Sequence, residues 1–208
     1  LSGVTDEARA QRVAQHQPVV AFGTPTLWPY TPGIPPYHNA GIWPFVTSYW
    51  TWASASAGNT PGVEHGLASL YRAAALFLTN KENMVAQTGH FEGTQINSNR
   101  QLWSVAGTLA TVYRVFFGMR FGPKGLRLDP FVPEGYSGTR TLEDVSYRNA
   151  TLDLTLEGHG VRITQITLDG EPLGAPVIPA DLTGRHEVRV VLSGGVPEGE
   201  VNRVAHRY

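Results

Sequence analysis

Residues Thr151-Leu152-Asp153-Leu154-Thr155-Leu156 decide the fold of one half of the chain. Their polar and apolar side chains alternate with period two, which is the pattern of a strand with one buried and one solvated face. Similar alternation occurs at 161–163, 166–168 and 186–192, and Asp169-Gly170 is a favoured hairpin turn. We therefore predict a small antiparallel β-sandwich over residues 121–208.

The other half of the chain has the spacing of helices. Apolar residues recur at three- and four-residue intervals, which predicts helices at about 5–15, 44–57, 60–77 and 99–117. Pro44 suits the first position of a helix, and Ser98 with Gln101 fits a capping box. The last of these helices is apolar on more than one side, which indicates burial on more than one side. The sequence thus predicts an α+β protein with a helical domain over 1–120.

Composition excludes several classes of function. The 208 residues carry a formal charge of −1 and no cysteine, so nucleic acid is not an expected partner and thiolate metal sites are excluded. No run of about 18 apolar residues is present, so no membrane span is expected. The histidines and carboxylates lack the spacing of known metal motifs, and no glycine-rich phosphate loop occurs. We therefore expect neither a metal nor a cofactor.

The stretch Tyr37-His38-Asn39-Ala40-Gly41-Ile42-Trp43-Pro44-Phe45 combines groups that suit a sugar ligand. His38 and Asn39 can hydrogen-bond hydroxyl groups, and Tyr37 and Trp43 offer flat apolar faces for a pyranose ring. Trp28, in the preceding proline-rich loop, is a candidate for a further platform. The alternative is that these aromatic side chains only close the end of a helical core.

Helices with long loops, then strands, and the segment Tyr37–Pro44 together resemble the end of a six-hairpin glycoside hydrolase. The nearest likeness is to bacterial glycogen-debranching-related and rhamnosidase-like members. The resemblance implies that residues 1–120 are the last helical hairpins of an (α/α)6 toroid, followed by the β-sandwich. It also implies an oligosaccharide substrate, a secreted or periplasmic location, and further helices from the N-terminal remainder of the same protein.

The resemblance also implies a catalytic residue. In the toroid families the general base commonly lies in the loop before one of the last helices, which here points to Glu92, with His90 tuning its charge or touching the sugar. The reaction would proceed by inversion, in which a carboxylate activates a water molecule. The general acid would come from an earlier hairpin, and Glu64 and Glu82 are the alternatives within this chain. Phosphorolysis, sugar binding without catalysis, and a purely structural role are the competing functions.

Overall fold

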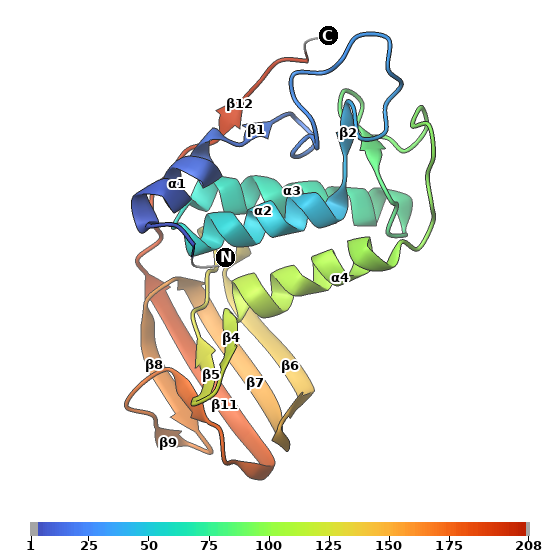
Figure 1. The fold of residues 1–208 in the computed structure, drawn as a ribbon. Coiled ribbons are helices and arrows are strands. Elements are labelled where there is room, and N and C mark those ends of the chain that lie inside the picture. The colour runs from blue at the N-terminus through green and yellow to red at the C-terminus, as the bar shows by residue number, and fades with distance from the viewer. Residues whose placement is uncertain (1–3, 207–208) are drawn as a thin grey trace. The chain divides into compact units, whose positions relative to one another are not determined.

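In the computed structural model, which describes residues 4–206, the chain divides between Thr111 and Val112 (Figure 1). The residues up to Thr111 form one unit together with those from Glu198 onward, and Val112–Pro197 form the other. We call them the helical unit and the sheet unit.

The helical unit contains α1 (Glu7–His16), α2 (Pro44–Ser56), α3 (Thr60–Phe77) and α4 (Leu102–Thr111). The N-cap of α1 is Asp6, whose carboxylate accepts the Arg9 N–H at 2.8 Å. Asn59 caps α3 in the same way, through the Gly62 N–H. Pro44 begins α2, as predicted.

Small residues bring α2 into close contact with α3 and α4. A Cβ atom placed on Gly66 would lie only 1.9 Å from Thr51 Oγ1, and one on Gly107 only 2.5 Å from Ser48 Oγ. Real Cβ atoms do not approach this closely, so these glycines set the distances between the helix axes.

Short strand pairs tie the loops of the helical unit together. β1 (Pro18–Val19) pairs in parallel with β12 (Asn202–Arg203), and β2 (Gly41–Ile42) pairs antiparallel with β3 (Met84–Val85). The adjoining core consists of buried side chains from loops and helix alike: Val20, Tyr30, Ala40, Ile42, Ala73, Met84 and Ala86. The loops are therefore part of the packed structure.

The sheet unit begins with a π-helical turn, Val112–Phe116, and contains two sheets. The first has the order β10-β5-β4 and the second the order β6-β7-β11-β8-β9. Their bounds are β4 (Met119–Gly122), β5 (Gly125–Leu128), β6 (Gly138–Tyr147), β7 (Asn149–Gly160), β8 (Ile163–Leu168), β9 (Glu171–Pro172), β10 (Val177–Pro179) and β11 (Thr183–Gly194), with a 3-10 turn at Glu134–Tyr136.

The alternating stretch Thr151–Leu156 lies in β7 with the predicted exposure. Leu152, Leu154 and Leu156 are buried, and the threonines and the aspartate between them are partly exposed. The hairpin turn at Asp169-Gly170 is also confirmed, with positive φ at both residues and β8 and β9 paired across it.

The predicted fold class, however, is wrong. The chain is 29% helical and 33% strand, and its four helices with mixed sheets are not toroid hairpins followed by a small antiparallel sandwich. In the five-stranded sheet, β11 pairs with β7 in parallel along its whole length, from Thr183 opposite Asn149 to Gly194 opposite Gly160. The strands β8, β9 and β10 separate these two in the sequence, so the chain has turned back to its original direction before β11 begins.

The last predicted helix is shorter than its sequence pattern. Arg100 has a φ of 56°, which interrupts a right-handed helix, so α4 begins at Leu102 and the Ser98–Gln101 capping box does not form. The Gln101 N–H instead donates to the carbonyl of Asn80. Among the described residues, no helix has both the length and the apolar character needed to cross a bilayer.

Candidate functional site

The loop that contains Tyr37 and the loop that contains Glu92 are joined by backbone hydrogen bonds (Figure 1). Gln95 N donates to Pro36 O, and Ala86 N donates to Ala40 O, each at 2.8 Å. The pairing of β2 with β3 adds a third connection. The two segments selected from the sequence therefore meet in the fold.

Five side chains from the first loop, α2 and α4 form a continuous aromatic cluster. It consists of Tyr37, His38, Trp43, Phe45 and Trp103. Trp43 is its centre: its ring lies 4.9 Å from the nearly parallel His38 ring, 5.1 Å from Tyr37 and 6.0 Å from Trp103. Trp43 is only 4% exposed, and its Nε1 donates to Tyr37 O at 3.0 Å. This ring therefore has a structural role, because it fixes the positions of the surrounding rings.

Trp103 is the exposed indole of the cluster, and His38 is exposed as well. Trp103 is 48% exposed. Its ring stacks on the Phe45 ring, with ring centres 5.1 Å apart and an angle of 24° between the planes. A supported indole with an exposed face provides a rigid apolar platform at little cost in conformational entropy.

A carboxylate lies beside the cluster. Tyr37 Oη donates to Glu82 Oε1 at 2.9 Å, and Glu82 is 5% exposed. The hydrogen bond to Glu82 raises the pKa of Tyr37, and burial and the negative charge of Glu82 act in the same direction. Among the described residues, Tyr37 is the one hydrogen-bond donor to this carboxylate.

Asn39 has a role inside its own loop. Its Oδ1 accepts the Thr31 N–H at 2.7 Å, and its Nδ2 donates to the carbonyls of Thr31 and Ile34 at 3.2 and 2.8 Å. The buried amide thus has a partner for its oxygen and two for its nitrogen. We interpret Asn39 as the residue that holds the loop closed behind His38 and Tyr37.

Glu92 is displayed on the surface of the second loop. Its side chain is 79% exposed, and its backbone N–H donates to His90 Nδ1 at 3.1 Å. That bond requires an unprotonated Nδ1, so it excludes an ion pair through the same nitrogen to Glu92 Oε2, 3.9 Å away. The His90 ring stacks on the Phe91 ring, with ring centres 4.6 Å apart, and makes an edge-to-face contact with the Phe77 ring.

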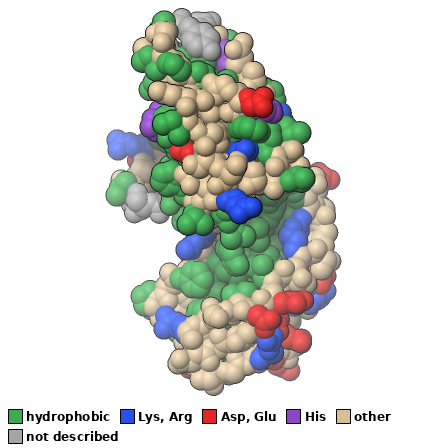
Figure 2. All heavy atoms as spheres, turned by 90° about the vertical axis from the view of Figure 1, so that its right-hand side faces the viewer, with side chains coloured by type: hydrophobic (Ala, Val, Ile, Leu, Met, Phe, Trp, Pro, Cys, Tyr) green, Lys and Arg blue, Asp and Glu red, His purple; other side chains and the backbone are tan. Residues whose placement is uncertain are grey.

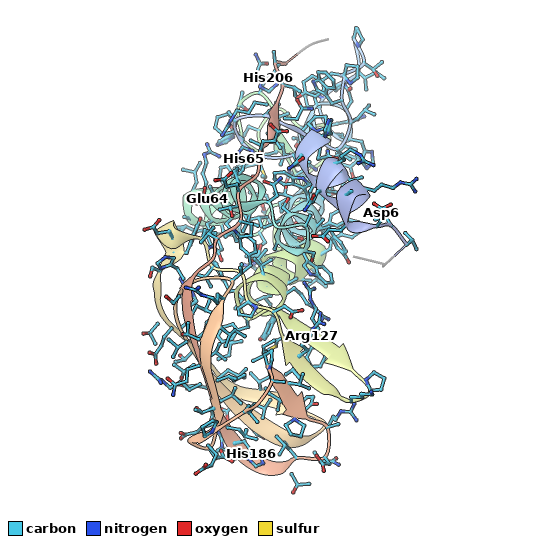
Figure 3. All side chains as sticks on the ribbon, turned by 90° about the vertical axis from the view of Figure 1, so that its left-hand side faces the viewer. Asp6, Glu64, His65, Arg127, His186 and His206 are labelled. Carbon is cyan, nitrogen blue, oxygen red and sulfur yellow. The ribbon has the colours of Figure 1, made fainter. Side chains whose placement is uncertain are left out.

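The other candidates from the sequence have different neighbours. Trp28 packs against the core around Ile42, and its Nε1 donates to the Ala205 carbonyl at 3.3 Å. Glu64, an alternative general acid, lies exposed on α3 next to His65 (Figure 3). Glu82, the other alternative, is the one that lies beside the aromatic cluster.

Sequence reasoning missed Trp103 and underrated Glu82. The exposure of Trp103 follows from the packing of α4, which buries Ser104 and Gly107 instead, and no pattern in the sequence indicated which face that would be. No local pattern pointed to Glu82, since its importance comes from Tyr37, a residue 45 positions away.

The sheet unit has a hollow of its own, with a volume of about 430 Å³, on strands β6, β7 and β11. Arg185 donates to both Asp144 and Asp153 there. The hydrogen bond from the Asp144 backbone N–H lowers the pKa of Asp153, and the bond from Arg185 acts in the same direction. The charged groups of the hollow largely satisfy one another across the strands, as on the solvated face of a sheet. Within residues 4–206, no group of three or more histidine or acidic side chains could hold a metal ion.

Comparison with known proteins provides no further assignment. No protein-family model matches the chain, and no curated protein matches it.

Proposed function

We propose that this protein binds an oligosaccharide at the aromatic cluster, with the exposed face of Trp103 as the platform for one sugar ring. The observation that carries the proposal is this half-exposed, supported indole in the same cluster as the Tyr37–Glu82 pair. The apolar C–H face of a pyranose stacks on such a ring, while its hydroxyl groups need hydrogen-bonding partners nearby.

The polar groups around the platform suit a neutral hydroxylated ligand. The Glu82 carboxylate accepts hydrogen bonds from hydroxyl groups, and the exposed His38 ring can donate or accept. Buried hydrogen bonds to a charged acceptor are the stronger ones, and they supply the orientation that stacking alone lacks. The segment Tyr37–Trp43 would thus form one wall of the sugar site.

Binding is tested by calorimetric titration of the chain with a panel of α- and β-linked oligosaccharides. We expect Trp103→Ala to weaken the affinity at least tenfold, because truncation of a tryptophan that anchors a binding site typically costs about 2 kcal/mol or more, and about 1.4 kcal/mol is tenfold in affinity. Phe121→Ala is the matched control, since Phe121 is a similarly exposed aromatic residue in the sheet unit. Unchanged affinity of Trp103→Ala, or no binding across the panel, would refute the proposal.

Glycoside hydrolysis is the second candidate, and the joining of the Tyr37 and Glu92 loops favours it. In this candidate, Glu92 acts as general base by activating a water molecule for inversion of the sugar bound at Trp103. Inversion requires a second carboxylic group roughly 6.5–9.5 Å from the base. Phosphorolysis is the close variant, in which phosphate replaces the water.

Hydrolysis is tested by release of reducing sugar from the oligosaccharides that bind, with and without added phosphate. Glu92→Gln keeps the shape of the side chain and removes the base, so hydrolysis should fall by about 10²-fold or more. Glu7→Gln, which changes an exposed carboxylate on α1, is the control. Normal turnover by a folded Glu92→Gln variant removes Glu92 from the mechanism, and strict dependence on phosphate selects phosphorolysis.

A further inference from the structure

The segment Glu198–His206, which we call the C-terminal strap, belongs to the helical unit although the sheet unit separates it from α4 in the sequence. Its strand β12 lies beside β1 and pairs with it in parallel (Figure 1). The Val204 N–H donates to Val19 O at 3.0 Å, and the Asn59 side chain donates to Glu200 O at 2.8 Å. Both residues of β12 are exposed, so the strap is attached mainly by hydrogen bonds.

The end of the strap contacts the proline-rich loop. Trp28 Nε1 donates to Ala205 O at 3.3 Å, and Tyr30 Oη lies 3.2 Å from His206 Nδ1. The backbone N–H of the residue after Tyr30 donates to Asn39 Oδ1 at 2.7 Å. The strap therefore supports the loop that leads to the aromatic cluster.

A partly buried histidine of α3, His65, lies next to this attachment. One helical turn further along α3, Ser69 Oγ donates to Phe22 O, which holds this face of the helix against the turn that follows β1. The rings of His65 and Trp50 meet edge to face, with centres 6.1 Å apart. Among the described residues, His65 Nε2 is enclosed without a hydrogen-bond partner. A charged imidazole here loses hydration that the protein does not fully replace.

Arg203 of the strap is the charged group that acts on His65. Burial lowers the pKa of His65, and the positive charge of Arg203 lowers it further, whereas backbone carbonyls of the turn at 20–23 act in the opposite direction. Helix α2 and that turn contain no charged residue, and Glu64 and Glu200 are exposed. On the face of the helical unit seen in Figure 2, charged side chains are isolated from one another. A proton on His65 therefore meets a second positive charge.

We propose that the C-terminal strap is an acid-sensitive switch, which detaches from β1 and from the proline-rich loop when His65 is protonated. Detachment returns the imidazole to water and separates it from Arg203, and both changes favour the protonated ring. The strap yields rather than α3, because a short exposed strand opens more easily than a packed helix. The neighbouring buried positions of α3 are apolar and at most 3% exposed: Val63, Leu67 and Leu70.

Amide hydrogen exchange of the full chain, followed by NMR between about pH 7.5 and about pH 5.5, tests the switch without any sugar ligand. After correction for the intrinsic effect of pH on exchange, the Val204 N–H should become less protected as the pH falls. The expected loss is at least about twofold and at most about tenfold, the limit for a histidine whose pKa is 6.5 in the detached state. The Trp28 indole N–H should follow, whereas the amides of α2 and α3 should keep their protection.

Substitutions separate the switch from general effects of acid. Arg203 is exposed, so its variants should fold normally. Arg203→Lys should keep the acid response, Arg203→Gln should reduce it, and Arg203→Glu should reduce it further, because a carboxylate there attracts the charged imidazole. His65→Gln should abolish the response. The controls are His16→Gln and His206→Gln, which change the histidines beside and within the strap and should leave its pH dependence intact.

Several outcomes overturn the proposal. One is equal protection of the Val204 N–H at both ends of the pH range. Another is an acid response that persists in His65→Gln, or that is the same in Arg203→Lys and Arg203→Glu. Simultaneous loss of protection in α2, α3 and the strap means global unfolding instead of detachment, and it also overturns the proposal. If His65→Gln does not fold, the Arg203 series decides alone.

Discussion

Replacement of Gly107 by alanine should destabilise the helical unit, although alanine is the better helix former. In an unconstrained helix, Gly→Ala stabilises by about 0.8–1 kcal/mol. Here the new Cβ would lie 2.5 Å from Ser48 Oγ, 3.1 Å from Ser48 Cβ and 3.2 Å from Phe45 Cα. The hydroxyl can rotate away, but the other two atoms belong to the stem and backbone of α2.

The magnitude follows from these contacts. Rotation of the Ser48 hydroxyl breaks its 2.7 Å hydrogen bond to Phe45 O, at a cost of about 0.5–1.5 kcal/mol. Separation of α2 and α4 by a few tenths of an ångström adds an overpacking cost of about 1–3 kcal/mol. After the gain in helix propensity is subtracted, we expect a loss of about 0.5–3.7 kcal/mol in the free energy of unfolding.

Urea unfolding followed by tryptophan fluorescence measures this loss. All five tryptophans precede residue 104, so the signal reports on the helical unit. Ser48→Ala in the Gly107→Ala background removes the closest contact and should restore about 1 kcal/mol in a double-mutant cycle. If Gly107→Ala is as stable as the wild type, or if the cycle shows no coupling, the close helix contact is not the reason for glycine at this position.

Three further predictions concern stability. His186 on β11 (Figure 3) has Nδ1 2.7 Å from Asp169 Oδ2 and Nε2 3.0 Å from Thr183 O, and the carboxylate bond raises its pKa. The contribution of this bond should therefore be complete below pH 6.5, as long as Asp169 is ionised, and should be lost as the pH rises through the folded pKa of His186. A hydrogen-exchange profile of β11 that keeps this trend in His186→Gln would contradict the assignment. The pKa of His65 is shifted in the opposite direction, because burial and the nearby Arg203 lower it. The helical unit should therefore lose stability as the pH falls below 6.5. His65→Gln should flatten this pH profile of stability, measured by tryptophan fluorescence. Leu154→Ala, at a fully buried site in β7, should cost about 2–5 kcal/mol in urea unfolding, whereas Thr155→Ala on the opposite face should cost less than about 1 kcal/mol.

Local patterns predicted the elements of this protein well. The alternation of Thr151–Leu156 identified a strand and its buried face, because period two places successive side chains on opposite sides of any strand. Pro44 and the three- and four-residue apolar spacing located α2 and α3, because helix starts and helix periodicity depend only on neighbouring residues.

Contacts between distant residues decided the rest. Alternation cannot distinguish a parallel from an antiparallel partner, so the pairing of β7 with β11 and the failure of the sandwich prediction were visible only in the fold. The same holds for the candidate site. Its chemistry was present in the sequence as Tyr37, Trp43 and Glu82, but only tertiary packing buried Trp43, joined Tyr37 to Glu82 and left Trp103 open to a ligand. Exposure and partnership depend on which surfaces meet in space, and residues far apart in the chain determine that.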